Sequence, residues 1–361
     1  MQYLAILGQN AQLSLAELLA VYPKIQIIIS DKDAVVFESK IKLDIARLGG
    51  MPKFAEILDI GNPEKIIFDY LCKLPKEKKI FFGLSFYGKP DKKLGITLKK
   101  KLKNAGYKVR LVTSRDLALS SVVIKTNKLL RRGGDFCIFK NYVARTVAVQ
   151  DFSDYEFRDV RRPARDLVSG MTPPKLAKML INLGGASDAI LDPFCGSGTF
   201  LMEAVLLGFH KVYGSDINDK AVKDSMKNLD WLKEQYKFKS KIEIKKCDIK
   251  TAGACWDKKF EYIATEPYLG PPIRGTLDLE KAKNLQKELE KNYDEYLKGL
   301  SKLLTENGTI ILIVPYIITA EKKLYLNLDI KKYGLKPVYE PILYSRPNQK
   351  IGREIYILEK S

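Results

Sequence analysis

The sequence is poor in the side chains that bind metals or form disulfides. It contains one histidine and five cysteines among 361 residues, and no two cysteines are spaced as C-x-x-C. Zinc sites need clustered cysteine or histidine ligands, and disulfide-rich domains need many closely spaced cysteines. We therefore expect no metal site and no disulfide framework, with the cysteines as small buried hydrophobic residues.

Long apolar runs are also missing. No segment approaches the roughly 20 consecutive apolar residues of a membrane helix. The first residues, MQYLAILGQN, have neither the basic start nor the small-residue cleavage site of a signal peptide. These absences predict a soluble, cytoplasmic protein that has no membrane partner.

Acidic residues are too few to balance the basic ones. The chain has 62 lysines and arginines against 43 acidic residues, a net charge of +19. A protein this basic most often has a polyanionic partner, with nucleic acid ahead of a membrane surface. A generally lysine-rich proteome is the alternative explanation, so the position of the charge matters.

Two stretches of different composition precede residue 150. The first fifty or so residues read as a strand, a helix and hairpin-like strands, in YLAILGQN, LSLAELLAVYP and IIISDKDAVVFES. The next stretch alternates apolar and basic runs, such as KKIFFGLSFYG and KKLGITLKKKLKNAGYKVRLV. The patterns predict two small α+β domains, over 1–55 and 56–150, of which the second is strongly basic.

A connector and a larger domain follow. Periodicity stops in DFSDYEFRDVRRPARDLVSG, so residues 151–170 are expected to link domains. Its arginines are Arg158, Arg161, Arg162 and Arg165. They either contact RNA or pair with nearby acidic residues, and we expect two of the four to pair. Over 171–361, helices alternate with apolar strands in βαβ order, which predicts a doubly wound parallel sheet.

The strongest chemical signal follows the first strand of that sheet. AILDPFCGSGTFLMEAVLLG reads as an apolar strand, a Gly-Ser-Gly turn and a helix, and ligands bind beside such turns. A dinucleotide site would add a third glycine, as G-x-G-x-x-G, so its absence favours S-adenosylmethionine. Loop amides around Gly196 and Gly198 can face the cofactor carboxylate, while Asp192 accepts from its amine. A purely structural turn is the alternative.

Three successive strands of this domain end in aspartate. Asp192 ends the first, Asp216 ends the second in YGSDIN, and Asp248 ends the third in KKCDI. Asp216 lies about 20 residues after the glycine turn, where an acidic side chain can bind ribose hydroxyls. Asp248 can then reach an adenine amino group. Each aspartate alone could cap a helix, but the ordered set favours a cofactor site.

The fourth strand runs into a stiff loop, TEPYLGPP. Methyl transfer to an exocyclic amine needs no metal and no covalent intermediate, only an aimed lone pair and a proton acceptor. Glu266 and the carbonyl of Pro267 can accept the two N–H bonds, while Tyr268 or Leu269 covers the base. No cysteine lies in the loop, which disfavours carbon-5 pyrimidine methylation by a thiolate and leaves a nitrogen or an oxygen as the acceptor. An ordinary tight turn is the alternative.

These motifs resemble the amino-methyltransferase branch of class I S-adenosylmethionine enzymes. From YLAILGQNAQLSLAELLAVYP through VVIKTNKLL to RPNQKIGREIYIL, the chain is similar to the THUMP-domain tRNA guanosine-10 N2-methyltransferases. The resemblance implies an α/β protein: a ferredoxin-like domain (1–55), a THUMP domain (56–150), a linker and a Rossmann-like methyltransferase domain (171–361). It also implies that the THUMP domain grips the tRNA acceptor end and that N2 of guanosine-10 receives the methyl group.

The resemblance and the patterns together give the expected site residues. The catalytic loop is Glu266, Pro267 and Tyr268. The cofactor-binding set is Met171, Thr172, Pro173, Asp192, Phe194, Gly196, Gly198, Thr199, Asp216, Ile217, Cys247 and Asp248. The expected RNA contacts are Lys99, Lys100, Lys103, Arg110, Lys125, Lys128, Arg131 and Arg132.

One departure falls in the catalytic loop. The family pattern is Asp-Pro-Pro-Tyr, whereas this chain has Glu266-Pro267-Tyr268-Leu269, which lengthens the acid by one methylene and moves the aromatic ring forward. A displacement near 1 Å can lower a rate about 10²-fold. Either the loop has shifted register, the target amine differs, or activity is lost.

The sequence leaves other functions open. Methylation of adenine or cytosine in DNA, or of another RNA base, would use a similar loop, and a silent RNA-binding protein would keep the fold. Tyr268 is either a stacking platform for an extruded base or a rim aromatic that packs on the loop. The number of methyl groups and any activator subunit are not readable, and we expect a monomer.

Overall fold

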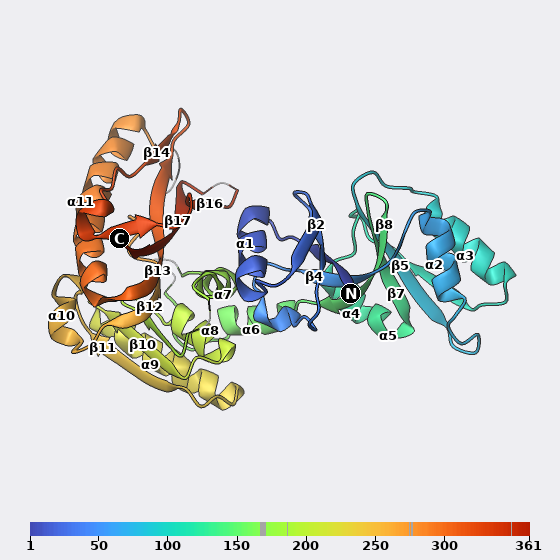
Figure 1. Cartoon of the computed structure of the whole chain (residues 1–361), viewed down its shortest axis with the longest axis horizontal. Helices are drawn as coiled ribbons and strands as arrows, with labels where there is room; N and C mark the ends of the chain where they lie inside the picture. The colour runs from blue at the N-terminus through green and yellow to red at the C-terminus, as the bar shows by residue number, and fades with distance from the viewer. Residues whose placement is uncertain (167–170, 186, 274, 276, 348) are drawn as a thin grey trace. The chain divides into compact units, whose positions relative to one another are not determined.

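The computed structural model divides the chain into two compact units, Met1–Asp154 and Tyr155–Ser361 (Figure 1). It describes residues 1–166, 171–185, 187–273, 275, 277–347 and 349–361. No helix within these ranges is long and apolar enough to cross a membrane.

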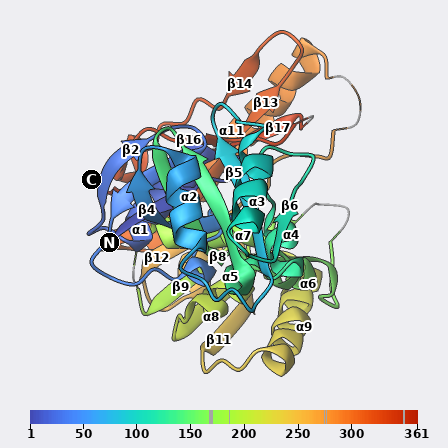
Figure 2. The ribbon, with the colours of Figure 1, turned by 90° about the vertical axis from the view of Figure 1, so that its right-hand side faces the viewer.

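The first unit contains one eight-stranded sheet in the order β2-β3-β1-β4-β8-β7-β5-β6. Its strands are β1 (Gln2–Ile6), β2 (Gln26–Ser30), β3 (Ala34–Glu38), β4 (Lys53–Ile60), β5 (Ile80–Tyr87), β6 (Val109–Val112), β7 (Gly133–Phe139) and β8 (Tyr142–Val149). Its helices are α1 (Ala11–Val21), η1 (Ile45–Arg47), α2 (Pro63–Leu71), α3 (Leu94–Asn104), α4 (Ser121–Thr126) and α5 (Leu129–Arg132). Helices α2 and α3 lie side by side and pack on the sheet through Ile67 and Leu98 (Figure 2).

The two N-terminal domains expected from the sequence share this sheet. The expected boundary at 55/56 falls inside β4, which pairs with β1 on one side and with β8 on the other. Because β4 satisfies backbone groups on both of its edges, the sheet continues across the boundary. The assignment of ferredoxin-like and THUMP domains by name stays a prediction.

A buried polar network crosses the middle of this sheet. The Lys53 ammonium donates to the Asp135 carboxylate at 2.8 Å, to the Ser85 hydroxyl at 3.1 Å and to the Leu119 carbonyl at 3.0 Å. Thr146 donates to the same carboxylate at 2.7 Å. Lys53 and Asp135 are almost fully buried, so each charge depends on the other for compensation.

The second unit contains a nine-stranded sheet with the main order β11-β10-β9-β12-β13-β17-β15. Its strands are β9 (Ala189–Asp192), β10 (Lys211–Asp216), β11 (Lys241–Lys246), β12 (Phe260–Thr265), β13 (Leu304–Ile318), β14 (Lys323–Tyr325), β15 (Leu335–Pro337), β16 (Ile342–Tyr344) and β17 (Ile351–Lys360). Strands β9 to β13 pair in parallel, whereas β17 is antiparallel to β13, β15 and β16. The sheet is therefore mixed, and the expectation of a wholly parallel sheet is wrong at its C-terminal end, where short hairpin connections replace crossover helices.

Helices cover both faces of this sheet. They are α6 (Phe152–Val160, at the division between the units), α7 (Pro174–Leu183), α8 (Thr199–Leu207), α9 (Asp219–Gln235), η2 (Ile249–Thr251), α10 (Ala252–Cys255), α11 (Leu279–Leu303) and η3 (Lys331–Tyr333). Leu289, Leu297 and Leu300 of α11 pack with Ile263 and Leu312 in one core. On α7, the carbonyl of Ile181 accepts a 2.6 Å hydrogen bond from Tyr262 of β12.

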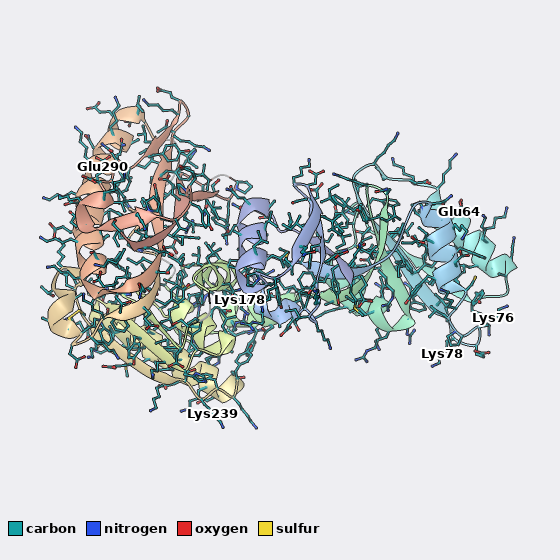
Figure 3. All side chains as sticks on the ribbon, in the orientation of Figure 1. Glu64, Lys76, Lys78, Lys178, Lys239 and Glu290 are labelled. Atoms are coloured by element: carbon teal, nitrogen blue, oxygen red, sulfur yellow. A yellow bond between two sulfur atoms is a disulfide. The ribbon has the colours of Figure 1, made fainter. Side chains whose placement is uncertain are left out.

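The expected connector is partly helical. Helix α6 buries Arg158, whose Nε donates to Glu203 of α8 at 2.7 Å, and Lys178 of α7 approaches the same carboxylate at 3.5 Å (Figure 3). Arg162 pairs with its neighbour Asp159 at 3.3 Å, as the sequence suggested. The last part of the connector, 167–170, lies outside the described residues.

The structure corrects the prediction that all five cysteines are small buried residues outside disulfides. Cys247 and Cys255 form a disulfide, because η2 and α10 bring their Cα atoms to 6.2 Å. Cys137 and Cys195 are free and buried, as expected, and Cys72 is half-buried. Among the described residues, no group of three or more histidine, cysteine, aspartate or glutamate side chains could hold a metal ion.

Candidate active site

Four acidic residues mark the carboxyl ends of four neighbouring strands. Asp192 and Asp216 are the last residues of β9 and β10, Asp248 follows β11 by two residues, and Glu266 directly follows β12. These strands are parallel neighbours in the order β11-β10-β9-β12. The structure therefore brings the expected acids to one edge of the sheet, where doubly wound folds bind ligands.

The loop between β9 and α8 needs its glycines. Gly196 and Gly198 have φ values of 51° and 86°, in the left-handed region that side chains disfavour. Helix α9 holds the loop from behind, because Ser225 donates to the Gly196 carbonyl at 2.7 Å and Asn228 donates to the Ser197 carbonyl at 2.8 Å. With these carbonyls engaged on the α9 side, the loop conformation is fixed before any ligand binds.

Asp216 and Asp248 lie at this edge of the sheet and also accept hydrogen bonds from nearby backbone amides. Asp216 accepts from the Gly196 amide at 3.0 Å and from the Asn218 amide at 2.9 Å. Asp248 caps η2 by accepting from the Lys250 amide at 3.0 Å. Both carboxylates are half-buried, so each keeps an accessible surface beside these bonds.

Asp192 is the most enclosed acid of the set. It is 1% exposed, and it accepts from the Thr265 hydroxyl at 2.5 Å and the Phe194 amide at 3.1 Å. Burial raises its pKa to about 7, the two hydrogen bonds oppose that rise, and the negative charges of Asp216 and Glu266 add to it. Its main contacts therefore tie β9 to β12, and the expected bond to a cofactor amine stays a prediction.

Glu266 is held by two donors from distant parts of the chain. The Arg353 Nε of β17 donates to its Oε1 at 2.6 Å, and the Thr172 hydroxyl donates to its Oε2. The side chains of Glu266 and Arg353 are only 10% and 12% exposed. Thr172 lies between Met171 and Pro173, all half-buried, directly before α7, which brings this expected cofactor segment to the acid of the catalytic loop.

Aromatic rings surround the same edge. Phe194 packs edge-on against Tyr296 of α11 at 4.7 Å between centroids, and Tyr296 packs against Tyr293 at 5.3 Å. Burial raises the pKa of Tyr296, and the charge of nearby Asp248 adds to the rise. Tyr268 is 46% exposed, as a base-stacking ring would need to be.

Several expected cofactor residues have other contacts. The Thr199 hydroxyl accepts from Arg162 at 2.7 Å, which ties α8 to the segment after α6. Ile217 is 64% exposed beside Asp216. Cys247 is disulfide-bonded to Cys255, so its sulfur is not a free thiol near the cofactor.

The sequence reasoning missed four residues at this edge: Thr265, Tyr293, Tyr296 and Arg353. Thr265 and Arg353 bond the expected acids, and Tyr293 and Tyr296 belong to the ring cluster. Arg353 stands inside the motif RPNQKIGREIYIL, but only the pairing of β17 with β13 brings it to Glu266, 87 residues away. No signal in the sequence encodes that distance.

The expected RNA contacts belong to the first unit. Seven are exposed and Lys99 is half-buried; the set is Lys99, Lys100, Lys103, Arg110, Lys125, Lys128, Arg131 and Arg132. Lys125 pairs with Asp151 at 2.8 Å, so its charge is already compensated. Exposed lysines in the segment after α2, such as Lys76 and Lys78, add further positive charge (Figure 3).

Three cations gather around one aromatic ring, and we call them the Phe81 cluster. Arg132, Arg110 and Lys79 have their charged groups 4.9, 5.4 and 5.8 Å from the ring centroid of Phe81. The sheet creates the cluster, because Arg110 of β6 pairs beside Phe81 of β5 and Arg132 directly precedes β7. Within the described ranges, none of the three cations forms an ion pair.

Curated relatives resemble part of the chain. A tRNA (guanine(10)-N2)-dimethyltransferase of Methanothermobacter thermautotrophicus is 31% identical over 53% of this chain and 50% of its own length. The protein of the same name from Pyrococcus abyssi is 29% identical over 59% of this chain and 57% of its own length. The chain thus matches about half the length of each of these relatives.

Solved structures give weaker likenesses. An S-adenosylmethionine-dependent methyltransferase from Clostridium acetobutylicum has a TM-score of 0.31 at 16% identity, covering 48% of this chain and 84% of its own. A glycopeptide N-methyltransferase complexed with sinefungin has a TM-score of 0.36 at 10% identity, covering 54% of this chain and 90% of its own.

A family model also matches the chain. The model of the UPF0020 family, described as an RMKL-like methyltransferase domain, matches residues 162–345. This range covers more than half of the chain and includes the glycine loop and all four strand-end acids. The chain therefore belongs to the UPF0020 family of RMKL-like methyltransferase domains.

Proposed function

We propose that this protein transfers a methyl group from S-adenosylmethionine to the exocyclic N2 amine of a guanosine in tRNA. The observation that carries the proposal is the position of Glu266, a fixed carboxylate at the end of β12 beside three strand-end aspartates. The names of the relatives support both the substrate and the position, guanosine-10. The net charge of +19 supports a polyanionic partner.

The residues present fit S-adenosylmethionine. Nothing lies within 4 Å of a Cβ built at Gly196, so the loop has open space where a ligand would approach. The half-buried carboxylates of Asp216 and Asp248 would hold the ribose hydroxyls and the adenine amine, and the amides of the glycine loop would face the methionine carboxylate. When bound, the cofactor supplies a methyl group on a positively charged sulfur.

The chain's own residues then orient the amine. The lone pair of a base amine is delocalised into the ring, so the amine needs to be held to act as a nucleophile. Glu266 and the carbonyl of Pro267 accept its two N–H bonds, and Glu266 takes the proton that the methylated nitrogen releases. Tyr268 stacks on the base once the base has been extruded from the RNA helix.

The first unit supplies the grip on tRNA in this proposal. The Phe81 cluster places three cations together, and further exposed lysines and arginines of the expected RNA-binding set extend the positive surface. Phosphate contacts of this kind give affinity without reading sequence. We assign the ferredoxin-like role to 1–55 and the THUMP role to 56–150, and we place the activity in a monomer in the cytoplasm.

Nucleoside mass spectrometry tests the proposal. An unmodified tRNA transcript incubated with the protein and S-adenosylmethionine should yield N2-methylguanosine or N2,N2-dimethylguanosine. The same transcript with adenosine at position 10 should stay unmodified, and Glu266→Ala should lose most of the product. If the protein binds tRNA and cofactor but forms no methylated guanosine, the target is another base or the reaction has been lost.

Cofactor binding distinguishes an enzyme from a silent RNA-binding protein. A ligand at 100 times its dissociation constant should stabilise the fold by about 2.7 kcal/mol. Thermal unfolding with and without S-adenosylmethionine measures this effect directly, and the absence of a shift would favour the silent protein.

A further inference from the structure

Arg353, on the last strand of the second unit, contacts the catalytic loop that follows β12. It lies on β17, where it pairs with Pro315 of β13, and β13 in turn pairs with β12. Its guanidinium extends past β13 to the residue that follows β12, Glu266. The antiparallel pairing of β17 with β13 brings Arg353 to this position. The parallel strands β9 to β13 alone would not place an arginine there.

Both carboxylate oxygens of Glu266 are engaged by protein donors. Arg353 Nε bonds Oε1 at 2.6 Å, and Thr172 bonds Oε2. Each oxygen keeps a second lone pair, because a carboxylate has about four acceptor sites. The acid can therefore be fixed by the protein and still accept from a substrate amine.

The guanidinium itself is supported. Its carbon lies 6.0 Å from the centroid of the Tyr344 ring on β16, within reach of a cation–π contact. The Tyr344 hydroxyl in turn accepts from Arg346 at 3.3 Å. Arg353 therefore has a second partner besides Glu266, and its side chain is only 12% exposed.

We infer that Arg353 is a positioning residue that fixes the direction of the Glu266 carboxylate for methyl transfer; the inference rests on the proposed function. A glutamate has one more rotatable bond than an aspartate, so a glutamate in this loop needs an additional restraint to hold one geometry. A charge-assisted hydrogen bond between two largely buried groups provides that restraint. Arg353 does not touch the reacting atoms and acts through Glu266.

Steady-state kinetics on tRNA separate positioning from binding. Arg353→Met should lower kcat about 10- to 100-fold, while KM for tRNA and the dissociation constant of S-adenosylmethionine stay within about twofold of wild type. Arg353→Lys keeps the charge but lacks the Nε donor, so its kcat should lie between those of Arg353→Met and the wild-type protein. Lys336→Met, an exposed cation on neighbouring β15, should leave kcat unchanged.

A double-mutant cycle links the effect to Glu266. If Arg353 acts through the acid, Arg353→Met combined with Glu266→Gln should have the kcat of Glu266→Gln alone. Additive losses, or a wild-type kcat in Arg353→Met, would overturn the inference. A parallel loss of cofactor affinity in both Arg353 variants would also overturn it, because it would indicate a general structural role.

The same cycle measured by thermal unfolding keeps the two proposals apart. If Arg353 and Glu266 are in contact, the double variant should shift Tm by less than the sum of the shifts of the two single variants. Additive shifts would reject the contact, whatever the tRNA assay gives. If the wild-type protein methylates no guanosine, the proposed function fails independently of this result.

Discussion

Thr265 donates a 2.5 Å hydrogen bond to Asp192 and thereby joins the last residue of β12 to the last residue of β9. Both side chains are almost fully buried. The bond lies between the glycine loop, which follows Asp192, and the catalytic loop, which follows Thr265. The two halves of the proposed reaction, cofactor binding and amine orientation, therefore share one buried contact.

Removing this contact should destabilise the second unit. Thr265→Val keeps the side-chain shape but leaves the Asp192 carboxylate without its main donor, which should cost about 1–3 kcal/mol of unfolding free energy. Because the bond favours the ionised acid, its loss raises the pKa of Asp192 further, and the destabilisation should be larger at pH 8 than at pH 5. Urea unfolding at both pH values measures this, with Thr265→Ser as the control that keeps the hydroxyl.

Glu354 should make the protein less stable as the pH rises. It is 6% exposed, and among the residues that the structure describes its Oε2 has no hydrogen-bond partner. Burial raises its pKa from 4.5 to about 7. A carboxyl with a raised folded-state pKa stabilises the fold below its unfolded pKa, and this contribution is lost as the pH rises through about 7. Glu354→Gln should therefore be more stable than wild type at pH 8, by on the order of 1–3 kcal/mol.

The matched comparison is the same pair of proteins at pH 4, where the wild-type acid is mostly protonated in both the folded and the unfolded state. There the difference in unfolding free energy should nearly vanish. An equal difference at both pH values would show that packing of the amide, and not ionisation, sets the stability of this position.

The Phe81 cluster should determine part of the salt dependence of RNA binding. Each lost phosphate contact lowers the slope of log K against log salt by about 0.7 to 0.9. Arg110→Ala and Arg132→Ala should each weaken tRNA binding and flatten this slope by up to one contact. Lys65→Ala removes an exposed lysine that already pairs with Asp69 at 2.9 Å, and it should leave the slope unchanged. Filter binding over a salt series gives the slopes.

Reducing the Cys247–Cys255 disulfide should affect stability and cofactor affinity together. A cross-link that closes a loop of this length is worth about 2–3 kcal/mol by the chain-entropy estimate. Asp248, proposed to face adenine, lies inside the closed loop, so its position also depends on the bridge. Cys255→Ser should lower Tm and weaken S-adenosylmethionine binding, as titration calorimetry would show. Cys72→Ser, a change at a free cysteine of the other unit, should leave cofactor affinity unchanged.

Local patterns made much of the site predictable. Asp192, Asp216, Asp248 and Glu266 each end or closely follow a short strand, and the order of parallel strands is enough to bring them to one edge. The glycine turn is also predictable from local sequence, because glycine readily adopts the left-handed φ values that Gly196 and Gly198 have.

Contacts made by distant segments were not predictable. Arg158 sits in a charged stretch that looks like a connector, yet helix α6 buries it against Glu203, 45 residues away. The Cys247–Cys255 spacing matches no common motif, and only the fold of η2 and α10 brings the sulfurs together. Likewise, the sequence of β4 does not show that this strand has partners on both edges.

The buried Lys53–Asp135 pair limits how this protein can be divided or recombined. The ammonium comes from the first 55 residues, whereas its carboxylate and its other acceptors, Ser85 and Leu119, come from the next 95 or so. A fragment that begins near residue 56 would leave Asp135 buried without its counter-charge, at a cost of several kcal/mol. We therefore expect Met1–Asp154 to be the smallest N-terminal piece that can be transplanted onto another catalytic domain, by gene fusion in evolution or by design in the laboratory.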